Sequence, residues 1–133
     1  MPHLLRWLGH SGWELVTAGG RRVLIDPWLS TNPKAPLSID QLERADIVLL
    51  THDHFDHASD VVAVVERTGG MFVAQPETAA RYQKDGIPQE RTVGGIGMNI
   101  GGTVEIAGIK VTMTDAYHTS ETGAPAGYIL TLE

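Results

Sequence analysis

The stretch that decides the fold runs from residue 46 to residue 57 and reads Asp-Ile-Val-Leu-Leu-Thr-His-Asp-His-Phe-Asp-His. The unbroken apolar run 47–50 predicts a strand that is covered on both faces, as in layered folds of strands and helices. Three of the six histidines of the chain follow within six residues. They lie at the carboxyl end of this strand, where such folds place their functional sites.

The spacing of these side chains predicts a metal site. In extended backbone, residues two apart point the same way, so His52 and His54 can direct two imidazoles at one ion. Asp56 and His57 follow a bend and can reach a second ion beside it. Imidazole and carboxylate ligands suit Zn²⁺, Mn²⁺, Fe²⁺ or Ni²⁺, whereas Ca²⁺ and Mg²⁺ require more oxygen. The alternative is a solvated, histidine-rich loop that binds no metal.

Composition restricts the class of protein. A chain of 133 residues, with 42% hydrophobic and 20% charged residues, has the size and balance of one globular domain, 1–133. It has no cysteine, which excludes a disulfide framework, a thiolate metal site and a cysteine nucleophile. A net charge of −6 argues against nucleic acid as a partner. We expect a cytoplasmic protein with a small-molecule substrate and no membrane segment.

The rest of the chain predicts an α+β domain. We expect a mixed sheet with helices stacked outside it, and a loop over 51–57. Ser38 with Gln41 predicts a capped helix ending near residue 44, and Ser59 predicts the cap of a helix through residue 67. A further helix begins at Pro76 and ends before Gly86. The strands are predicted at 4–7, 13–17, 22–25, 46–50, 71–74, 103–106, 109–114 and 128–132.

The histidine motif at 51–57 resembles the metal-binding motif of the metallo-β-lactamase superfamily. Blocks along the whole chain are similar to one branch of it, the metal-dependent hydrolases related to L-ascorbate 6-phosphate lactonase; they lie at 9–13, 24–28, 97–103, 117–120 and 125–128. The resemblance implies an αββα sandwich of which this chain supplies the N-terminal αβ half. It also implies a hydrolase that uses metal-activated water on an ester, lactone or phosphodiester.

The resemblance further implies a role for each site residue. His52, His54 and His118 would hold the first of two divalent ions, with zinc preferred and manganese, nickel or iron as alternatives. Asp56 and His57 would hold the second ion, and Asp56 would also face the nucleophile. Asp26 would orient the histidine loop by hydrogen bonds. His10 would contact the substrate or orient a ligand.

Several of these residues have a plainer interpretation. His118 could be a surface histidine, Asp26 could cap the turn at Pro27 and His10 could be structural. We expect Asp53 to face solvent or cap its loop, and the glycine-rich stretch 97–102 to form a turn and not a phosphate cradle. Core packing is favoured over the lining of a pocket mouth for Trp13, Trp28 and Phe55.

The family implied by the motif has two similar halves, and this sequence resembles the first. The second metal would therefore have only two protein ligands here, and one sheet face would be bare. We expect a second polypeptide to supply the C-terminal half, through a split gene or a cleaved chain, in preference to a second copy of this chain. The competing functions are a non-hydrolytic metal-binding or diiron redox module, whose members tend to carry glutamate in place of His54, and a regulatory half-domain without catalysis.

Overall fold

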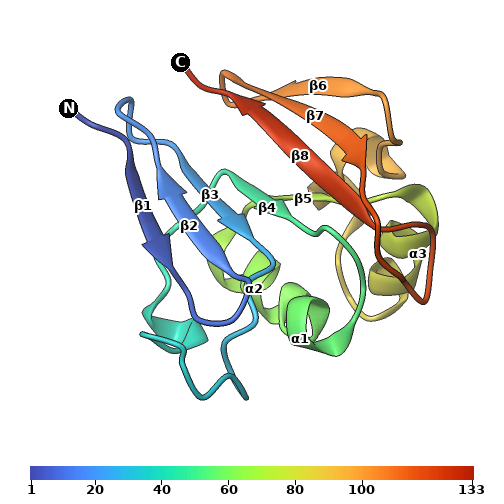
Figure 1. Ribbon diagram of the computed structural model, residues 1–133, viewed down its shortest axis with the longest axis horizontal. Coiled ribbons are helices and arrows are strands. Elements are labelled where there is room, and N and C mark those ends of the chain that lie inside the picture. The colour runs from blue at the N-terminus through green and yellow to red at the C-terminus, as the bar shows by residue number, and fades with distance from the viewer.

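The computed structural model describes residues 1–133, and its strands form two sheets (Figure 1). The larger sheet has the order β1-β2-β3-β4-β5, from strands Leu4–Trp7, Trp13–Val16, Arg22–Ile25, Ile47–Leu49 and Met71–Val73. Its first three strands are antiparallel and its last three are parallel. The smaller, antiparallel sheet has the order β6-β7-β8, from Thr103–Ile106, Ile109–Asp115 and Ala126–Thr131.

The α+β class is confirmed, but the single mixed sheet predicted from the sequence is wrong. The last three strands pair only with one another. The two-residue turn at Ala107 and Gly108 joins β6 to β7, and the connection over 116–125 returns the chain as the antiparallel strand β8. Parallel strands need a longer crossover, and helices supply it between β4 and β5.

The α-helices cover one face of the larger sheet (Figure 1). They are α1 (Phe55–Ala58), α2 (Val61–Thr68) and α3 (Pro76–Lys84). The predicted helix at 38–44 shrinks to the 3-10 turn η1 (Ile39–Gln41), and two further 3-10 turns follow α3 as η2 (Gln89–Arg91) and η3 (Val93–Gly95). No helix has both the length and the apolar composition that a membrane span requires.

The predicted cap at Ser59 is wrong, and so is the loop predicted for the whole of 51–57. The chain turns helical five residues earlier than expected, at Phe55, so that Ser59 is the C-cap of α1 and Asp60 is the N-cap of α2. Asp60 also accepts hydrogen bonds from the backbone amides of Leu29 and Ser30, at 2.6 and 2.9 Å. That long-range contact fixes where α2 starts and has no local sequence signal.

Two cores lie on opposite faces of the larger sheet. Alternation along the strands sends Leu24, Val48 and Phe72 into the core under the helices. It sends Val23, Ile47, Leu49 and Val73 into the core against Ile109, Val111 and Met113 of the smaller sheet. The burial of each such side chain away from water contributes about 1.5–3 kcal/mol to the stability of the fold. The buried strand β4, which precedes the histidine motif, is therefore held from both sides.

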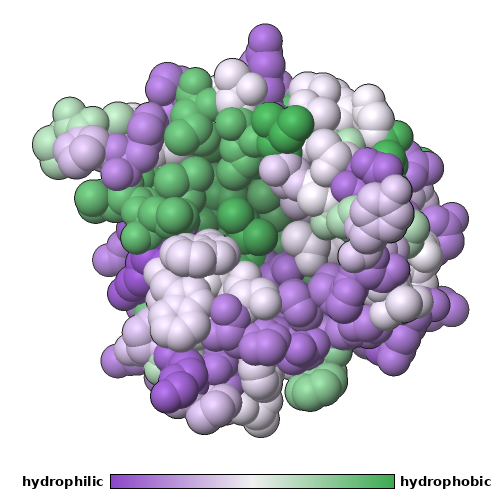
Figure 2. Space-filling view, in the orientation of Figure 1, coloured by the Kyte–Doolittle hydropathy of each residue, from purple (hydrophilic) through white to green (hydrophobic).

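The inner face between the sheets is open along one edge. Leu5 is 63% exposed and Trp7 is 50% exposed. Leu15, Ile25 and Leu130 are only partly buried where they pack on the inner core. Figure 2 shows a broad hydrophobic area on the side where β1–β3 and β8 lie in Figure 1.

Candidate metal centre

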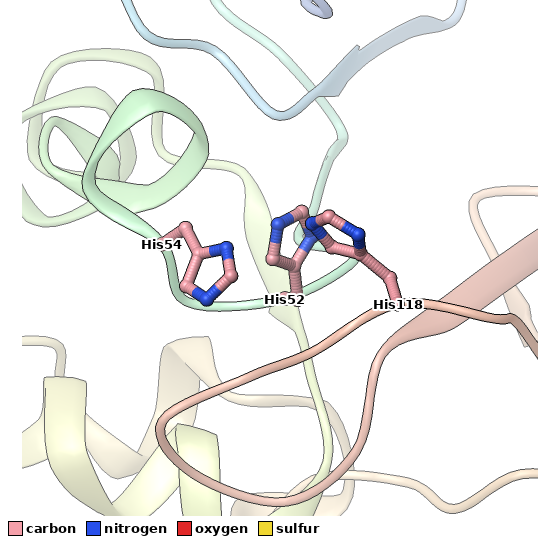
Figure 3. Close-up of side chains that lie close together, drawn as sticks. All are labelled: His52, His54 and His118. Atoms are coloured by element: carbon pink, nitrogen blue, oxygen red, sulfur yellow. The ribbon is translucent and has the colours of Figure 1, made fainter.

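Three imidazoles from two distant segments converge beside the carboxyl end of β4. His52 and His54 come from the loop after this strand, and His118 comes from the segment that joins β7 to β8 (Figure 3). The ring centroids of His52 lie 4.7 Å from those of both His54 and His118. One nitrogen of each ring lies within 4.8 Å of the others, which is the clustering that a shared ion needs.

Hydrogen bonds fix the proton of His52 on the nitrogen that faces away from the cluster. The Thr51 hydroxyl has one proton and donates it to the Asp26 carboxylate at 2.6 Å, since a carboxylate can only accept. The same oxygen must then accept from His52 Nδ1, 2.9 Å away. His52 Nε2 is left as a lone pair that is buried and has no hydrogen-bond partner. An orphaned buried nitrogen is unfavourable in a folded protein unless something binds it.

The charge state of His52 agrees with this assignment. Burial, together with the nearby imidazole of His57, lowers the pKa of His52 to about 4. The ring is therefore neutral near pH 7, in the form that binds metal.

A second group of donors lies next to the first. His10 Nε2 donates to Asp56 Oδ2 at 2.8 Å, and the ring of His57 lies beside both residues. Burial opposes ionisation of Asp56, but the hydrogen bond from His10 and the charge of His57 lower the pKa of this carboxyl. His10 stands on a left-handed backbone with φ of 54°, in a turn that Trp7 Nε1 holds by donating to the His10 carbonyl at 2.8 Å.

Asp26 joins the two groups. Its Oδ1 accepts from the Thr51 amide at 2.8 Å, and its Oδ2 accepts from the Thr51 hydroxyl and from His57 Nδ1 at 2.7 Å. Burial favours the neutral form of His57, but this hydrogen bond and the Asp26 charge raise the pKa of the ring. One buried carboxylate thus sets a ligand candidate in each group, through Thr51 for His52 and directly for His57.

The structure therefore brings together all seven residues that the sequence singled out for the site. The ring centroids of His52 and His57 lie only 4.1 Å apart, so the two donor groups form one continuous centre. The sixth histidine, His3, lies elsewhere and accepts a hydrogen bond from the Ala18 amide. The donors are nitrogen and carboxylate oxygen without sulfur, and this set fits zinc and related transition metals.

The expectation for Asp53 is wrong. This residue is 2% exposed, and it accepts hydrogen bonds from the segment that carries His118. Burial acts against ionisation, but the hydroxyls of Thr122 and Ser120 and the Glu121 amide lower the pKa of Asp53 to about 2. A signal for this orientation was present, since the alternation that points His52 and His54 one way points the residue between them the other way.

Core packing is also the wrong interpretation for the three aromatic residues: Trp13 is 38% exposed and belongs to neither core, and the other two lie beside the site. Phe55, 70% exposed, and Trp28 line a hollow of about 370 Å³ with Trp7, His10, Lys34 and Asp56. The ring of Trp28 makes edge contacts to His10 and Phe55, with centroids 5.3 and 5.8 Å apart. The hollow therefore opens directly beside the second donor group.

Comparisons with known proteins agree on one family. Residues 21–133 match the model of the beta-lactamase superfamily domain. The chain is 47% identical over 132 residues to a UPF0173 metal-dependent hydrolase of Nitratidesulfovibrio vulgaris, covering 99% of this chain and 55% of that protein. A relative from Lawsonia intracellularis is 44% identical over 126 residues, covering 95% and 54%. The chain thus spans about half the length of the curated relatives it matches.

Solved structures show the same fold. A metallo hydrolase from the archaeon Ignicoccus hospitalis superposes with a TM-score of 0.81 at 30% identity, over 96% of this chain and 55% of that one. The diiron β-hydroxylase CmlA of Streptomyces venezuelae superposes with a TM-score of 0.76 over 98% of this chain and 28% of that one, and at 17% identity this likeness concerns the fold alone. The fold predicted from the resemblance is thereby confirmed. With its histidine motif, its paired sheets and these relatives, the chain belongs to the metallo-β-lactamase superfamily.

Proposed function

We propose that this chain is the metal-binding half of a metal-dependent hydrolase that acts on an ester, lactone or phosphodiester. The observation that carries the proposal is the lone pair of His52 Nε2, which is buried, unpartnered and flanked by the imidazoles of His54 and His118. When bound, the metal would lower the pKa of a water so that it becomes a nucleophile near neutral pH.

The donor sets support two divalent ions, with zinc preferred and manganese, nickel or iron as alternatives. His52, His54 and His118 would hold the first ion with one position left open for water, as in three-histidine zinc sites. Asp56 and His57 would hold the second. His10, which donates to Asp56, would orient this carboxylate and present its ring to the substrate.

The hollow beside Asp56 is the place for the substrate. Its walls are Trp7, Trp28 and Phe55, so it suits an apolar arm of the substrate next to the reacting bond. Trp28 Nε1 donates to the Thr31 hydroxyl at 2.9 Å, which holds that ring in place. Lys34 on the rim adds a positive charge for an anionic group.

We further propose that a separate C-terminal half, and not a second copy of this chain, covers the open inner face. Leu5 is 63% exposed and Trp7 is 50% exposed on this face. The partly buried side chains of Leu15, Ile25 and Leu130 continue the apolar surface toward the inner core. A contiguous apolar area of this kind marks an interface. The relatives, at about twice this length, contain a segment of the required size. That half would also complete the ligands of the second ion.

The test is a native mass spectrum of the purified chain with zinc, followed by hydrolysis of an aryl ester, a lactone and a bis-aryl phosphodiester. We expect a complex with a second, distinct chain, two bound ions and zinc-dependent turnover of at least one substrate. His54→Ala should lose turnover and zinc, while His3→Ala, a histidine outside the cluster, should keep both. A metal-free monomer or homo-oligomer would refute the proposal. A metal-loaded complex without turnover would favour the regulatory half-domain, and iron absorbance with oxygen consumption would favour the redox module.

A further inference from the structure

Asp53 accepts more hydrogen bonds than any ligand candidate around it. Its Oδ1 accepts from the Ser120 hydroxyl at 2.7 Å and from the Glu121 amide at 2.8 Å. Its Oδ2 accepts from Arg81 Nη1 at 2.9 Å, from the Thr122 amide at 3.0 Å and from the Thr122 hydroxyl. The side chain is fully buried, so these five donors replace its entire hydration.

Four of the five donors belong to one short segment. Residues 120–122 follow His118 by two to four positions, in the connection between β7 and β8. Asp53 lies between His52 and His54 in the sequence. The carboxylate therefore ties the loop that supplies two imidazoles to the segment that supplies the third, across 67 residues of chain.

The fifth donor supplies a positive charge beside the buried carboxylate. Arg81, on α3, bonds Asp53 and also Glu121 at 2.6 Å, so the buried negative charge has a cationic partner. His118 itself is exposed and makes no hydrogen bond that would hold its backbone in place. Its position therefore depends on the anchoring of the residues that follow it.

We propose that Asp53 is a positioning residue that sets His118 against His52 and His54 and so determines the geometry of the three-histidine site. This inference rests on the proposed function, since it assumes that the three rings bind an ion. Groups that orient metal ligands typically change metal affinity by about 10–100-fold when they are replaced. A role in stability alone would leave the affinity of the folded protein unchanged.

The matched control is Asp60, a second buried aspartate that holds a loop but has no link to His118. It accepts from the amides of Leu29 and Ser30 and from the Ser30 hydroxyl at 2.6 Å. Asp53→Asn and Asp60→Asn each place an amide group against donors, so both should destabilise the chain, the first by more because Asp53 has more donors and an ion pair with Arg81. Only the first should disturb the metal site.

The experiment uses cobalt(II) and the full chain in an Asp56→Ala background, which removes the second site and leaves the three-histidine site to be read alone. Asp53→Asn should weaken cobalt binding about 10–100-fold. It should also lower the visible absorption toward that of His118→Ala, because six-coordinate cobalt absorbs less strongly than four-coordinate cobalt. Asp60→Asn should match the parent in both measurements. Thr122→Val, which removes one donor and leaves Asp53 intact, should shift both in the same direction by a smaller amount.

Amide exchange on the metal-free variants supplies a second readout. The amides of Glu121 and Thr122 should lose protection in Asp53→Asn and keep it in Asp60→Asn. If Asp53→Asn binds cobalt with the affinity and spectrum of the parent, the inference is overturned while the proposed function stands. If the parent binds no cobalt, the proposed function fails and this inference fails with it.

Discussion

Replacing Asp26 by asparagine exchanges one carboxylate oxygen for an NH₂ group, and it should move the proton from Nδ1 to Nε2 on two imidazoles of the candidate metal centre. The carboxylate now accepts from His57 Nδ1 and, through Thr51, keeps the proton of His52 on Nδ1. If the asparagine oxygen keeps the bond from the Thr51 amide, its NH₂ group faces the Thr51 hydroxyl and the His57 ring. Both must then accept, so the proton of each ring moves to Nε2, where it blocks the metal.

The size of the effect follows from these bonds. Restoring the metal-binding form of either ring would leave a buried donor without an acceptor, because Asp26 is 3% exposed. Such a group costs about 1–3 kcal/mol, and since tenfold in affinity is about 1.4 kcal/mol, each ion should bind about 5–150-fold more weakly. Asparagine tolerates the left-handed backbone of this position, where φ is 46°, whereas alanine would add strain. Asp26→Asn therefore isolates the chemistry of the carboxylate.

The assay is zinc competition against a chelator, with nitrogen-15 NMR to read the proton of each ring in the metal-free protein. Thr51→Val is the control, since it removes the hydroxyl that links Asp26 to His52 but leaves the bond to His57 intact. It should weaken one ion, and Asp26→Asn should weaken both. Unchanged ring protonation together with unchanged zinc affinity in Asp26→Asn would refute the reasoning.

Two further predictions test the charge state and the hollow. The pKa of His52 is about 4 in the folded chain and near 6.5 in the unfolded chain, so the unfolded state binds more protons between these pH values. The free energy of unfolding of the metal-free protein should therefore fall by on the order of 2–3 kcal/mol as the pH falls from 6.5 to 4. Urea unfolding across this range should show that loss, and His52→Asn should flatten it. Phe55→Ala should raise KM for an aryl ester several-fold with kcat and stability unchanged, because the ring is 70% exposed and lines the hollow; an unchanged KM would remove Phe55 from the binding surface.

What the sequence predicted well depended on local spacing. The buried strand β4, the neighbouring strands β2 and β3 and the helix that begins at Pro76 are each specified by residues within a few positions of one another. The pair His52 and His54 belongs to the same class. His118 could be assigned only by resemblance, because nothing near it in the sequence indicates a ligand.

What the sequence did not predict depended on contacts between distant residues. The start of α2 is fixed by Asp60 and a loop 30 residues earlier, and the burial of Asp53 is fixed by donors more than 60 residues later. Core packing is the general expectation for aromatic residues, yet Phe55, the first residue of the short helix α1, is 70% exposed and lines the hollow. Ala58 is the buried residue of α1, whereas the ring of Phe55 makes an edge contact to Trp28 beside the centre.

Asp26 and Asp53, two of the three buried aspartates, explain how an acidic chain could build a site for a cation from neutral rings. Asp26 lies on one side of the histidine loop and, through Thr51 and His57, leaves the metal-facing nitrogens free of protons. Asp53 lies on the other side and is satisfied by Arg81 and the 120–122 segment, so its charge does not compete for the ion. Both carboxylates act through hydrogen bonds, one on the protonation of the ligands and the other on their spacing. Exchanging either for asparagine should therefore give different failures, a blocked nitrogen in one case and a misplaced ring in the other.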